Sequence, residues 1–475
     1  MQQLVQQLDV RLKQIPMPEL PVEERIRTFS EVALGYSEEQ ALAESSRCLQ
    51  CEHPLCTQMC PLHVDIRGFI RLLRLGAYTE AAEKIREKNC LPSVCGRVCP
   101  QEVLCMMGCK NTIGDPVNIG ALERFVADWE LEKSANVPEI SASTGKSVAV
   151  VGSGPAGLSA ATELAKMGHH VVIFEALHEA GGVMTYGIPE FRLPKKVVRQ
   201  EINRIKKLGV EITTNVVIGK TITIDELFEE GFSSVFIGSG AGLPKLLGIP
   251  GENLCGVYSL NEFLLRINLM RAHAFPKEST PIKVYDRVAI LGARGLDAAR
   301  CALRLGAKEA CIFYQRKVVG RRDEIRRGME EGVKFVPLTK PLRLIGDDKR
   351  WVKQVELANL ELGPLGKTGK PKLITIEGSK FQYDAKTVVI ASEHNPNTLP
   401  ATNTSKNVKI NEKNKTIIVN PVSMEAAQGI FAGGDVVSGA SSVIKAIEAG
   451  KRAAQSINKY LMKGYSDIGL SDQLA

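Results

Sequence analysis

The sequence lacks the long apolar segments that membrane-spanning and exported proteins carry. None of its uninterrupted apolar runs reaches the roughly 20 residues that a membrane helix needs, and the opening MQQLVQQLDVRLKQIPMPELP contains nothing like the hydrophobic stretch of a secretory signal. We therefore expect a cytoplasmic protein without membrane insertion.

Aromatic residues are also scarce, and charge is not concentrated. They make up 5% of the 475 residues, and the formal net charge of +8 is dispersed along the chain. No helix-turn-helix and no basic aromatic patch is evident, so we expect no nucleic-acid partner, and a DNA-reading redox or iron sensor ranks last among the functions considered.

Cysteine, by contrast, is abundant and tightly grouped. Nine of the twelve cysteines lie between Cys48 and Cys109, and eight of these form the runs C-x2-C-x4-C-x3-C-P and C-x3-C-x5-C-x3-C. The first run is Cys48, Cys51, Cys56 and Cys60, and the second is Cys95, Cys99, Cys105 and Cys109. Disulfides are disfavoured in a reducing compartment, so thiolates at this density indicate a metal centre.

The spacing favours iron–sulfur clusters over zinc. Zinc ribbons also use C-x2-C pairs, but the longer spacings and the prolines after Cys60 and Cys99 are more typical of cluster ligation. Eight thiolates match two four-cysteine clusters, and the runs need not map one-to-one onto them. Between the runs, IRGFIRLLRLGAYTEAAEKIREKN has helical periodicity and predicts a helix pair that brings them together. The remaining cysteines are expected to be a free thiol, Cys90, and small core residues, Cys255, Cys301 and Cys311.

A dinucleotide site is predicted after the cysteine region, where SVAVVGSGPAGLSAATELAKMGHHVVIFEA reads as strand, glycine turn, helix and strand. Gly152 permits the tight turn, Gly154 lets a pyrophosphate approach the backbone, and Gly157 allows close packing of helix and sheet. Glu175, at the end of the second strand, can accept hydrogen bonds from ribose hydroxyls.

Two later segments favour FAD over NAD at this site. AGGVMTYGIPEFRLP supplies a second glycine pair, and GIFAGGDVVSGASSVIKAIEAGKRAA ends a strand in Gly433-Gly434-Asp435 before a helix from about Ser442. Asp435 can bond the ribityl or phosphate region of a flavin, and the helix dipole can favour negative charge near its pyrimidine edge. The alternative is a helix-capping aspartate that binds no ligand.

A second nucleotide unit begins at RVAILGARGLDAARCALRLGAKEACIFYQR, and its glycine turn is altered. Gly292 occupies the first glycine position, but Arg294 stands at the second, where a bulky side chain obstructs a pyrophosphate. The following strand ends near the basic residues Arg316, Lys317, Arg321 and Arg322. These side chains can hold the 2′-phosphate of NADP(H) or can form an exposed basic helix, and the sequence favours neither reading.

Together these elements resemble the small, iron–sulfur flavoprotein subunit of NADPH-dependent glutamate synthase. The same module is similar to the large subunit of NADH-dependent reduced ferredoxin:NADP oxidoreductase and to the N-terminal part of dihydropyrimidine dehydrogenase. The phrases that carry the resemblance include EVALGYSEEQALAESSRCLQCEHPLC, CGRVCPQE, LERFVADWE, GIPEFRLPK, GLPKLLGIPGENLCGVYSLNEFLLRINLM and AGGDVV, and they cover nearly the whole chain.

The resemblance implies specific ligands for each cofactor. One [4Fe-4S] cluster would be held by Cys48, Cys51, Cys56 and Cys109, and the other by Cys60, Cys95, Cys99 and Cys105. FAD would lie against Gly152, Ser153, Gly154, Pro155, Ala156, Gly157, Glu175, Gly182, Arg192, Gly434, Asp435 and Val443. NADP(H) or NAD(H) would lie against Gly292, Arg294 and Arg316. Where the family reads GGGNxAxDxAR, this chain has the shorter GARGLDAAR, and IASEHNPN replaces the family's usual segment before the final proline motif.

The expected architecture is an N-terminal α-helical iron–sulfur domain followed by two α/β Rossmann-like domains, the second inserted in the first. We place the cluster domain at residues 1–145, the FAD domain at 146–275 plus 391–475, and the nicotinamide-binding-like domain at 276–390. The expected function is that of an FAD-dependent NAD(P)H oxidoreductase subunit that moves electrons between NAD(P)H, FAD, two clusters and a partner subunit in a hetero-oligomer. Hydride transfer to a flavin needs no protein acid or base, so no catalytic residue is predicted. The alternative is an electron-transfer relay in a larger complex, which no longer binds nicotinamide.

Overall fold

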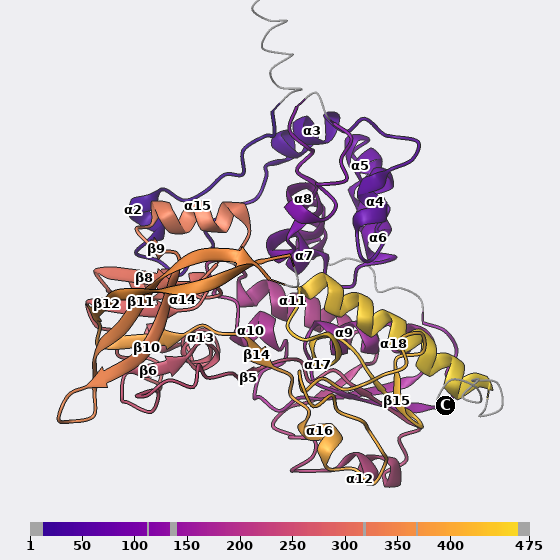
Figure 1. Cartoon of the computed structure of the whole chain (residues 1–475). Helices are drawn as coiled ribbons and strands as arrows, with labels where there is room; N and C mark the ends of the chain where they lie inside the picture. Colours follow the sequence, from indigo (N-terminus) through magenta and orange to yellow (C-terminus); the bar gives the residue numbers. More distant parts are fainter. Residues whose placement is uncertain (1–12, 112–113, 134–139, 317–319, 367–368, 464–475) are drawn as a thin grey trace, which may run out of the picture.

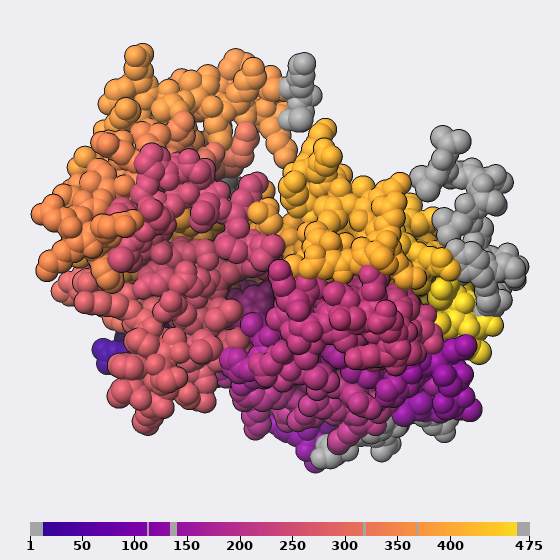
Figure 2. Space-filling model, turned by 90° about the horizontal axis from the view of Figure 1, so that it is seen from below, coloured from indigo at the N-terminus to yellow at the C-terminus, as the bar shows by residue number. Residues whose placement is uncertain are grey.

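The computed structural model describes residues 13–111, 114–133, 140–316, 320–366 and 369–463. Within them a helical unit lies above two α/β units that stand side by side (Figure 1). Seen from below, the two α/β units form separate lobes, one built from residues around 250–390 and the other from the preceding and following segments (Figure 2). The expected fold class is confirmed.

The helical unit contains both cysteine runs. Its elements are α2 (Val22–Arg25), α3 (Glu38–Ser46), α4 (Leu55–Met59), α5 (Ile66–Arg74), α6 (Tyr78–Arg86), α7 (Pro92–Val98), the 3-10 turn η1 (Gln101–Val103) and α8 (Ile119–Glu132). Ser37 and Gln40 form a capping box that starts α3, while the Asp65 side chain caps α5 by accepting from the Gly68 amide. The helix pair predicted between the runs is therefore present as α5 and α6.

The first sheet has six strands in the order β15-β16-β4-β1-β2-β3, all parallel except the β15–β16 pair. Its strands are β1 (Ser147–Val151), β2 (His170–Phe174), β3 (Glu211–Thr213), β4 (Ser234–Ile237), β15 (Glu425–Ala427) and β16 (Ile430–Ala432). The associated helices are α9 (Pro155–Lys166), α10 (Val183–Tyr186), α11 (Lys195–Lys206), α12 (Ile224–Glu229), α16 (Leu399–Thr402), α17 (Asp435–Ser438) and α18 (Val443–Lys463). The central strand β1 reads SVAVV and is buried, as a parallel strand covered on both faces requires.

The second sheet has five parallel strands in the order β6-β13-β7-β8-β9. They are β6 (Val257–Ser259), β7 (Arg287–Leu291), β8 (Glu309–Phe313), β9 (Lys334–Val336) and β13 (Thr387–Ile390), with α13 (Leu260–Asn268), η2 (Ala272–Ala274), α14 (Leu296–Arg304) and α15 (Arg322–Glu330). β6 and α13 lie in this unit although the expected boundary followed them at residue 276, because β6 pairs with β13 and α13 packs into the second core. The short ribbon of β5 (Leu243–Pro244) and β14 (His394–Asn395) joins the two units.

A three-stranded antiparallel sheet extends from the second unit. It consists of β10 (Thr339–Gly346), β11 (Val352–Leu365) and β12 (Pro371–Asp384), and it forms the orange arm in Figure 1. Cys255 lies beside this sheet, where its backbone forms an isolated β-bridge with Trp351, and its side chain is exposed. The expectation that Cys255 is a core residue is therefore wrong, since its apolar sequence neighbours pack while its own side chain faces outward. Cys301 and Cys311 are buried, as expected.

No helix within the described residues is both long and apolar enough to cross a membrane.

Candidate functional site

The first glycine turn joins β1 to α9 and has the geometry that a pyrophosphate requires. Gly152 has a φ of +96°, and a Cβ there would lie 2.8 Å from the Gly238 carbonyl oxygen. A Cβ at Gly157 would lie 1.8 Å from the Gly152 carbonyl oxygen, so only glycine allows the helix to pack this closely. At Gly154, by contrast, the Cβ position opens into free space, which leaves room for a ligand at the N-terminus of α9.

Glu175 follows β2 and is tied to this turn. Its Oε2 accepts from the Ser153 amide at 3.0 Å and from the Ser153 hydroxyl at 2.5 Å, while its Oε1 accepts from the Leu177 amide at 2.8 Å. The carboxylate is buried, and its orientation is fixed by these bonds. A carboxylate has about four lone-pair sites, so Glu175 retains capacity for ribose hydroxyls.

Three glycine segments that are far apart in the sequence converge around this turn. A Cβ at Gly182 would lie 2.7 Å from the Cα of Gly154, and a Cβ at Gly434 would lie 2.8 Å from the Cβ of Ala156. Gly182 and Gly434 both have positive φ, at +54° and +76°. The structure therefore brings together the glycines that the sequence assigned to one cofactor.

Asp435 and the start of α18 form another wall of the same site. Asp435 Oδ1 accepts from the amide and the hydroxyl of Ser441, and burial raises the pKa of this carboxyl. Burial also raises the pKa of Tyr186 to about 12, and the charges of Glu175 and Asp435 act on it in the same direction. The Ser442 hydroxyl, directly before Val443, is buried and has no hydrogen-bond partner among the described residues. A bound ligand would satisfy such a group, so the site fits FAD.

Lys195 is a residue of this region whose role the sequence did not reveal. Its buried Nζ donates to the carbonyls of Met184, Ile188 and Leu193, at 3.0 Å, 2.5 Å and 2.9 Å. These three bonds tie together α10 and the loop GIPEFRLP that follows it. The lysine ends the phrase GIPEFRLPK, but only the fold shows that its partners are backbone carbonyls.

The second glycine turn, between β7 and α14, is equally tight. Gly292 has a φ of +135°, and a Cβ there would lie 2.2 Å from the Ala391 carbonyl oxygen. A Cβ at Gly295 would lie 2.0 Å from Ile290, so Gly295 takes the helix-packing role that Gly157 has in the first turn. Arg294 stands between them, and its positive charge acts on both Asp435 and His394.

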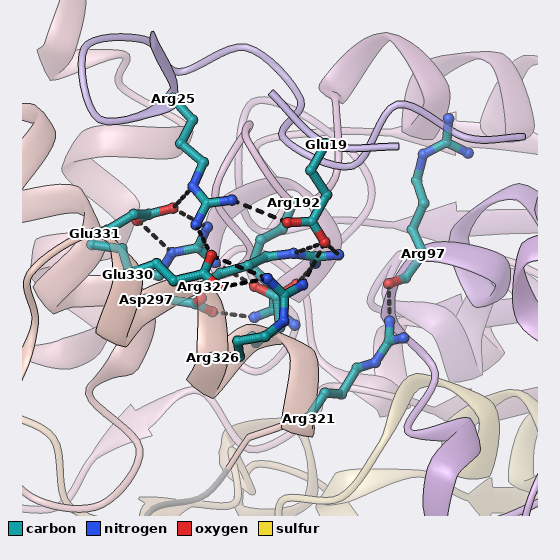
Figure 3. Close-up of polar contacts among 12 residues, drawn as sticks. Glu19, Arg25, Arg97, Arg192, Asp297, Arg321, Arg326, Arg327, Glu330 and Glu331 are labelled. Atoms are coloured by element: carbon teal, nitrogen blue, oxygen red, sulfur yellow. Dashed lines mark hydrogen bonds and ion pairs between the residues drawn. The ribbon is translucent and has the colours of Figure 1, made fainter. Parts of the chain in front are cut away.

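The first turn of α14 carries an ion pair rather than free donors. Arg192, expected to bind FAD, donates from Nη1 to Asp297 at 2.5 Å (Figure 3) and approaches Glu324 at 3.3 Å. Arg192 therefore links the flavin unit to the second unit.

The basic residues after β8 also differ in their surroundings. Arg316 donates to the carbonyl of Pro371 at 3.0 Å on the antiparallel arm, whereas Lys317 lies outside the described residues. Arg321 donates to the carbonyl of Arg97 at 2.5 Å (Figure 3) and pairs with Glu102 at 3.4 Å, and both partners belong to the helical unit. Arg316 and Arg322 are both exposed, and Arg322 lies at the start of α15.

The cysteines fall into two sets that mix the sequence runs. In the outer set, Cys48, Cys51, Cys56 and Cys109 are all half-buried. Burial raises the pKa of Cys56 to about 11, and the neighbouring thiols of Cys109, Cys48 and Cys51 act in the same direction. The four thiols are thus electrostatic neighbours, although Cys109 comes from the second run.

The inner set contains Cys60, Cys95, Cys99 and Cys105, all of them buried. Three of these residues, Cys60, Cys99 and Cys105, line one cavity together with Phe69, Glu123 and Ile444. Burial raises the pKa of Cys105 well above its ordinary value, with Cys99, Glu123 and Cys60 adding to it. Bound iron would supply the positive charge that stabilises such thiolates, so the donor set fits a cluster.

Glu123 was not predicted as part of this site. Burial raises the pKa of this carboxyl to about 7, opposed by a hydrogen bond from Asn89 Nδ2 at 2.8 Å. No three His, Cys, Asp or Glu side chains in the described part of the chain converge as they would around a single ion. In a four-iron cluster each thiolate binds a different iron, so the sulfurs need not meet at one point.

Comparisons with known proteins agree with these two sites. Residues 25–135 match the family model "dihydropyrimidine dehydrogenase domain II, 4Fe-4S cluster", and residues 146–450 match "pyridine nucleotide-disulphide oxidoreductase". The chain is 33% identical to the glutamate synthase [NADPH] small chain of Halomonas elongata, over 93% of this chain and 95% of that one. It is also 33% identical to the corresponding small chain of Escherichia coli, over 95% and 98% of the two chains. Among solved structures, FprA from Mycobacterium tuberculosis in complex with NADPH shares the fold, with a TM-score of 0.54 and 20% identity over 66% of this chain and 84% of that one.

Proposed function

Because the chain belongs to the family of the small chain of NADPH-dependent glutamate synthase, we propose that it is the iron–sulfur flavoprotein subunit of an oxidoreductase. In this proposal it moves electrons between NAD(P)H, FAD and two [4Fe-4S] clusters, to or from a partner subunit. The outer cysteine set holds one cluster, the inner set holds the other, and FAD lies against the three converging glycine segments.

One observation carries the proposal, namely the order in which the sites follow one another. The cavity of the inner set is lined by Ile444, the residue after Val443 at the wall of the flavin site. The inner set in turn belongs to a buried cluster of side chains against which Cys48, Cys56 and Cys109 of the outer set pack. The outer cysteines are half-buried, whereas the inner ones are buried. These contacts support a path that runs from the flavin site through the inner set and the outer set to the protein surface.

The bound cofactors supply the chemistry of a two-electron hydride acceptor coupled to one-electron carriers. The protein positions them: Glu175 and Ser153 orient the ribose side of FAD, and Lys195 ties α10 to the loop that follows it. The buried inner set keeps its ligands away from water. We propose that the units comprise residues 1–145, then 146–242 with 396–475, and 243–395.

A second candidate function follows from the second glycine turn. Arg294 occupies the place of the glycine that would face a pyrophosphate. This replacement favours an electron-transfer relay in a larger complex that does not bind nicotinamide.

Anaerobic reduction distinguishes the two functions. Protein purified without oxygen is analysed for iron, acid-labile sulfide and flavin, and its flavin absorbance is then followed after addition of NADPH, NADH or dithionite. Bleaching by a nicotinamide supports the oxidoreductase, and bleaching by dithionite alone supports the relay. In the relay case, Arg294→Gly should restore space for a pyrophosphate and confer bleaching by a nicotinamide. Protein that lacks iron, sulfide and flavin would contradict both functions.

A further inference from the structure

The exposed face of α5 carries an arginine stripe formed by Arg67, Arg71 and Arg74. The helix buries Ile66, Phe69, Ile70 and Leu73 against the helical unit, whereas the three arginines, spaced i, i+4 and i+7, lie together on the exposed side. Within the described residues, the side chains of Arg71 and Arg74 make no hydrogen bond and no ion pair. This distinguishes them from the arginines between the units, which are paired with carboxylates.

The arginine stripe borders the outer cysteine set. Arg67, Arg71 and Arg74 line an open groove with Gln50, Leu75, Gly68 and Asp65. The Asp65 carboxylate accepts from the Gly68 amide at 2.9 Å and forms no ion pair with the stripe among the described residues. At one end of the groove, Gln50 Nε2 donates to the Cys48 sulfur at 3.3 Å, and Arg67 Nη1 donates to the Cys51 carbonyl at 3.1 Å. The groove wall therefore touches two of the four residues proposed to hold the outer cluster.

An apolar rim lies around the same cysteines. Leu49, Leu55 and Met107 are 60%, 40% and 61% exposed, and each lies within two residues of a cysteine of the outer set. Gly108 brings the two segments together, since a Cβ there would lie 2.9 Å from the backbone of Leu55. Exposed apolar residues that adjoin a charged rim are the usual composition of a protein-binding surface.

We propose that the arginine stripe and the apolar rim form the docking surface for an acidic redox protein, which exchanges electrons with the outer set. The proposal rests on the proposed function and names the surface at which the electron path ends. An acidic partner fits because arginine guanidinium groups match carboxylates in geometry as well as in charge, and two of the three have no such partner within the chain. α5 also lies on the side of the helical unit away from α15, so neither α/β unit covers it (Figure 1).

The test uses the complete protein and a plant-type two-iron ferredoxin as the acidic probe. Wild type is compared with Arg71→Glu/Arg74→Glu and with the matched control Lys409→Glu/Lys413→Glu, which makes the same charge change on exposed residues of the flavin unit. Equal iron, sulfide and flavin contents establish that each variant is intact. Association is measured by the fluorescence anisotropy of labelled ferredoxin, and electron transfer by stopped-flow reduction of ferredoxin by dithionite-reduced protein from which excess dithionite has been removed.

At low ionic strength we expect the arginine double variant to lose about tenfold in both affinity and second-order rate constant, and the control to lose less than twofold. Added salt should weaken wild type toward the level of the variant. Leu55→Asn should reduce affinity without changing its dependence on salt.

Other outcomes overturn the docking surface. The first is that wild-type protein does not bind the ferredoxin probe. The second is that the arginine variant and the control lose equal affinity for it. The third is that the arginine variant loses binding to heparin or anionic vesicles while its ferredoxin kinetics stay unchanged. Failure of the proposed function would give a different result. If the protein binds ferredoxin through the arginine stripe but transfers no electrons to it, the docking surface is supported and the proposed redox function is contradicted.

Discussion

The carboxylate of Glu331 is the centre of the junction between the N-terminal segment and the second α/β unit, and its replacement by glutamine should open that junction. Its Oε2 lies 2.8 Å from Arg300 Nε and 2.7 Å from Arg304 Nη1, and its Oε1 lies 3.3 Å from Arg25 Nε (Figure 3). The side chains of Glu331, Arg300 and Arg304 are fully buried. Burial opposes ionisation, but the bonds from Arg300 and Arg304 hold the pKa of Glu331 below its ordinary value.

The expected loss of stability follows from the burial of this ion pair. Removing one partner of a buried ion pair costs about 3–5 kcal/mol, because the remaining charge stays buried without compensation. At about 1.4 kcal/mol per tenfold change, Glu331→Gln should raise the local opening equilibrium about 100- to 4,000-fold. The adjacent Glu330 pairs with Arg25 and Arg326, but its side chain is 37% exposed. Glu330→Gln should therefore cost no more than about 1 kcal/mol and serves as the matched control.

Hydrogen exchange measured by mass spectrometry reads this opening directly, because the amides of α14 exchange only when the helix opens. We expect amides of Leu296–Arg304 to lose protection in Glu331→Gln and to keep it in Glu330→Gln. If the two variants exchange alike, the buried pair does not hold the junction and the reasoning from burial fails.

Three further predictions test the cofactor sites and the junction. Cys105→Ser should lower bound iron and sulfide by about half. Cys255→Ser should leave both unchanged, because Cys255 is exposed and belongs to neither set. Equal iron in the two variants would contradict the proposal that the inner set holds a cluster. Gly182→Ala should abolish FAD binding, read from the flavin-to-protein ratio, because the new Cβ meets the backbone of Gly154; Gly209→Ala, also at positive φ but with no atom within 4 Å of its Cβ, should retain flavin. Burial opposes ionisation of Glu19, but bonds from Arg327 and Arg326 lower its pKa below 4.5. The stability that ionised Glu19 gives to the N-terminal segment is therefore fully present above pH 4.5 and is lost as the pH falls through the lowered pKa. Pepsin cleavage of the segment before α3 should differ between wild type and Glu19→Gln at pH 5 and become the same in stronger acid.

The local elements of the cofactor sites could be predicted because their signals are local. The unit SVAVVGSGPAGLSAATELAKMGHHVVIFEA folds as Ser147–Val151, Pro155–Lys166 and His170–Phe174, and the helix expected from about Ser442 begins at Val443. In each case an alternation of apolar strand, glycine turn and amphipathic helix lies within about 30 residues. Which glycines face each other, as Gly182 faces Gly154, could be inferred only through the family resemblance.

Features that depend on contacts between distant segments could not be predicted. The boundary between the α/β units fell after α13 in our prediction, because the pairing of β6 with β13 joins residues about 130 positions apart. The arm formed by β10, β11 and β12 was not foreseen, since nothing in its alternating pattern distinguishes it from strands of the neighbouring sheet. The role of Lys195 escaped prediction because its acceptors are backbone carbonyls, which have no signature in the sequence.

Arginine shows most clearly why the chain's charge could not be interpreted residue by residue. Arg321, considered for a ribose 2′-phosphate, binds the helical unit more than 200 positions away, while Arg300 is buried between Glu324 and Glu331. Arg71 and Arg74 look no different in the sequence, yet on the exposed face of α5 their side chains have no partner among the described residues. A guanidinium group is charged in every one of these places, so its role depends on whether the fold brings it a carboxylate. Beside the outer cysteine set the fold brings none to Arg71 and Arg74, so these groups stay solvated and available to carboxylates of another molecule, and this is the physical basis for expecting an acidic partner there.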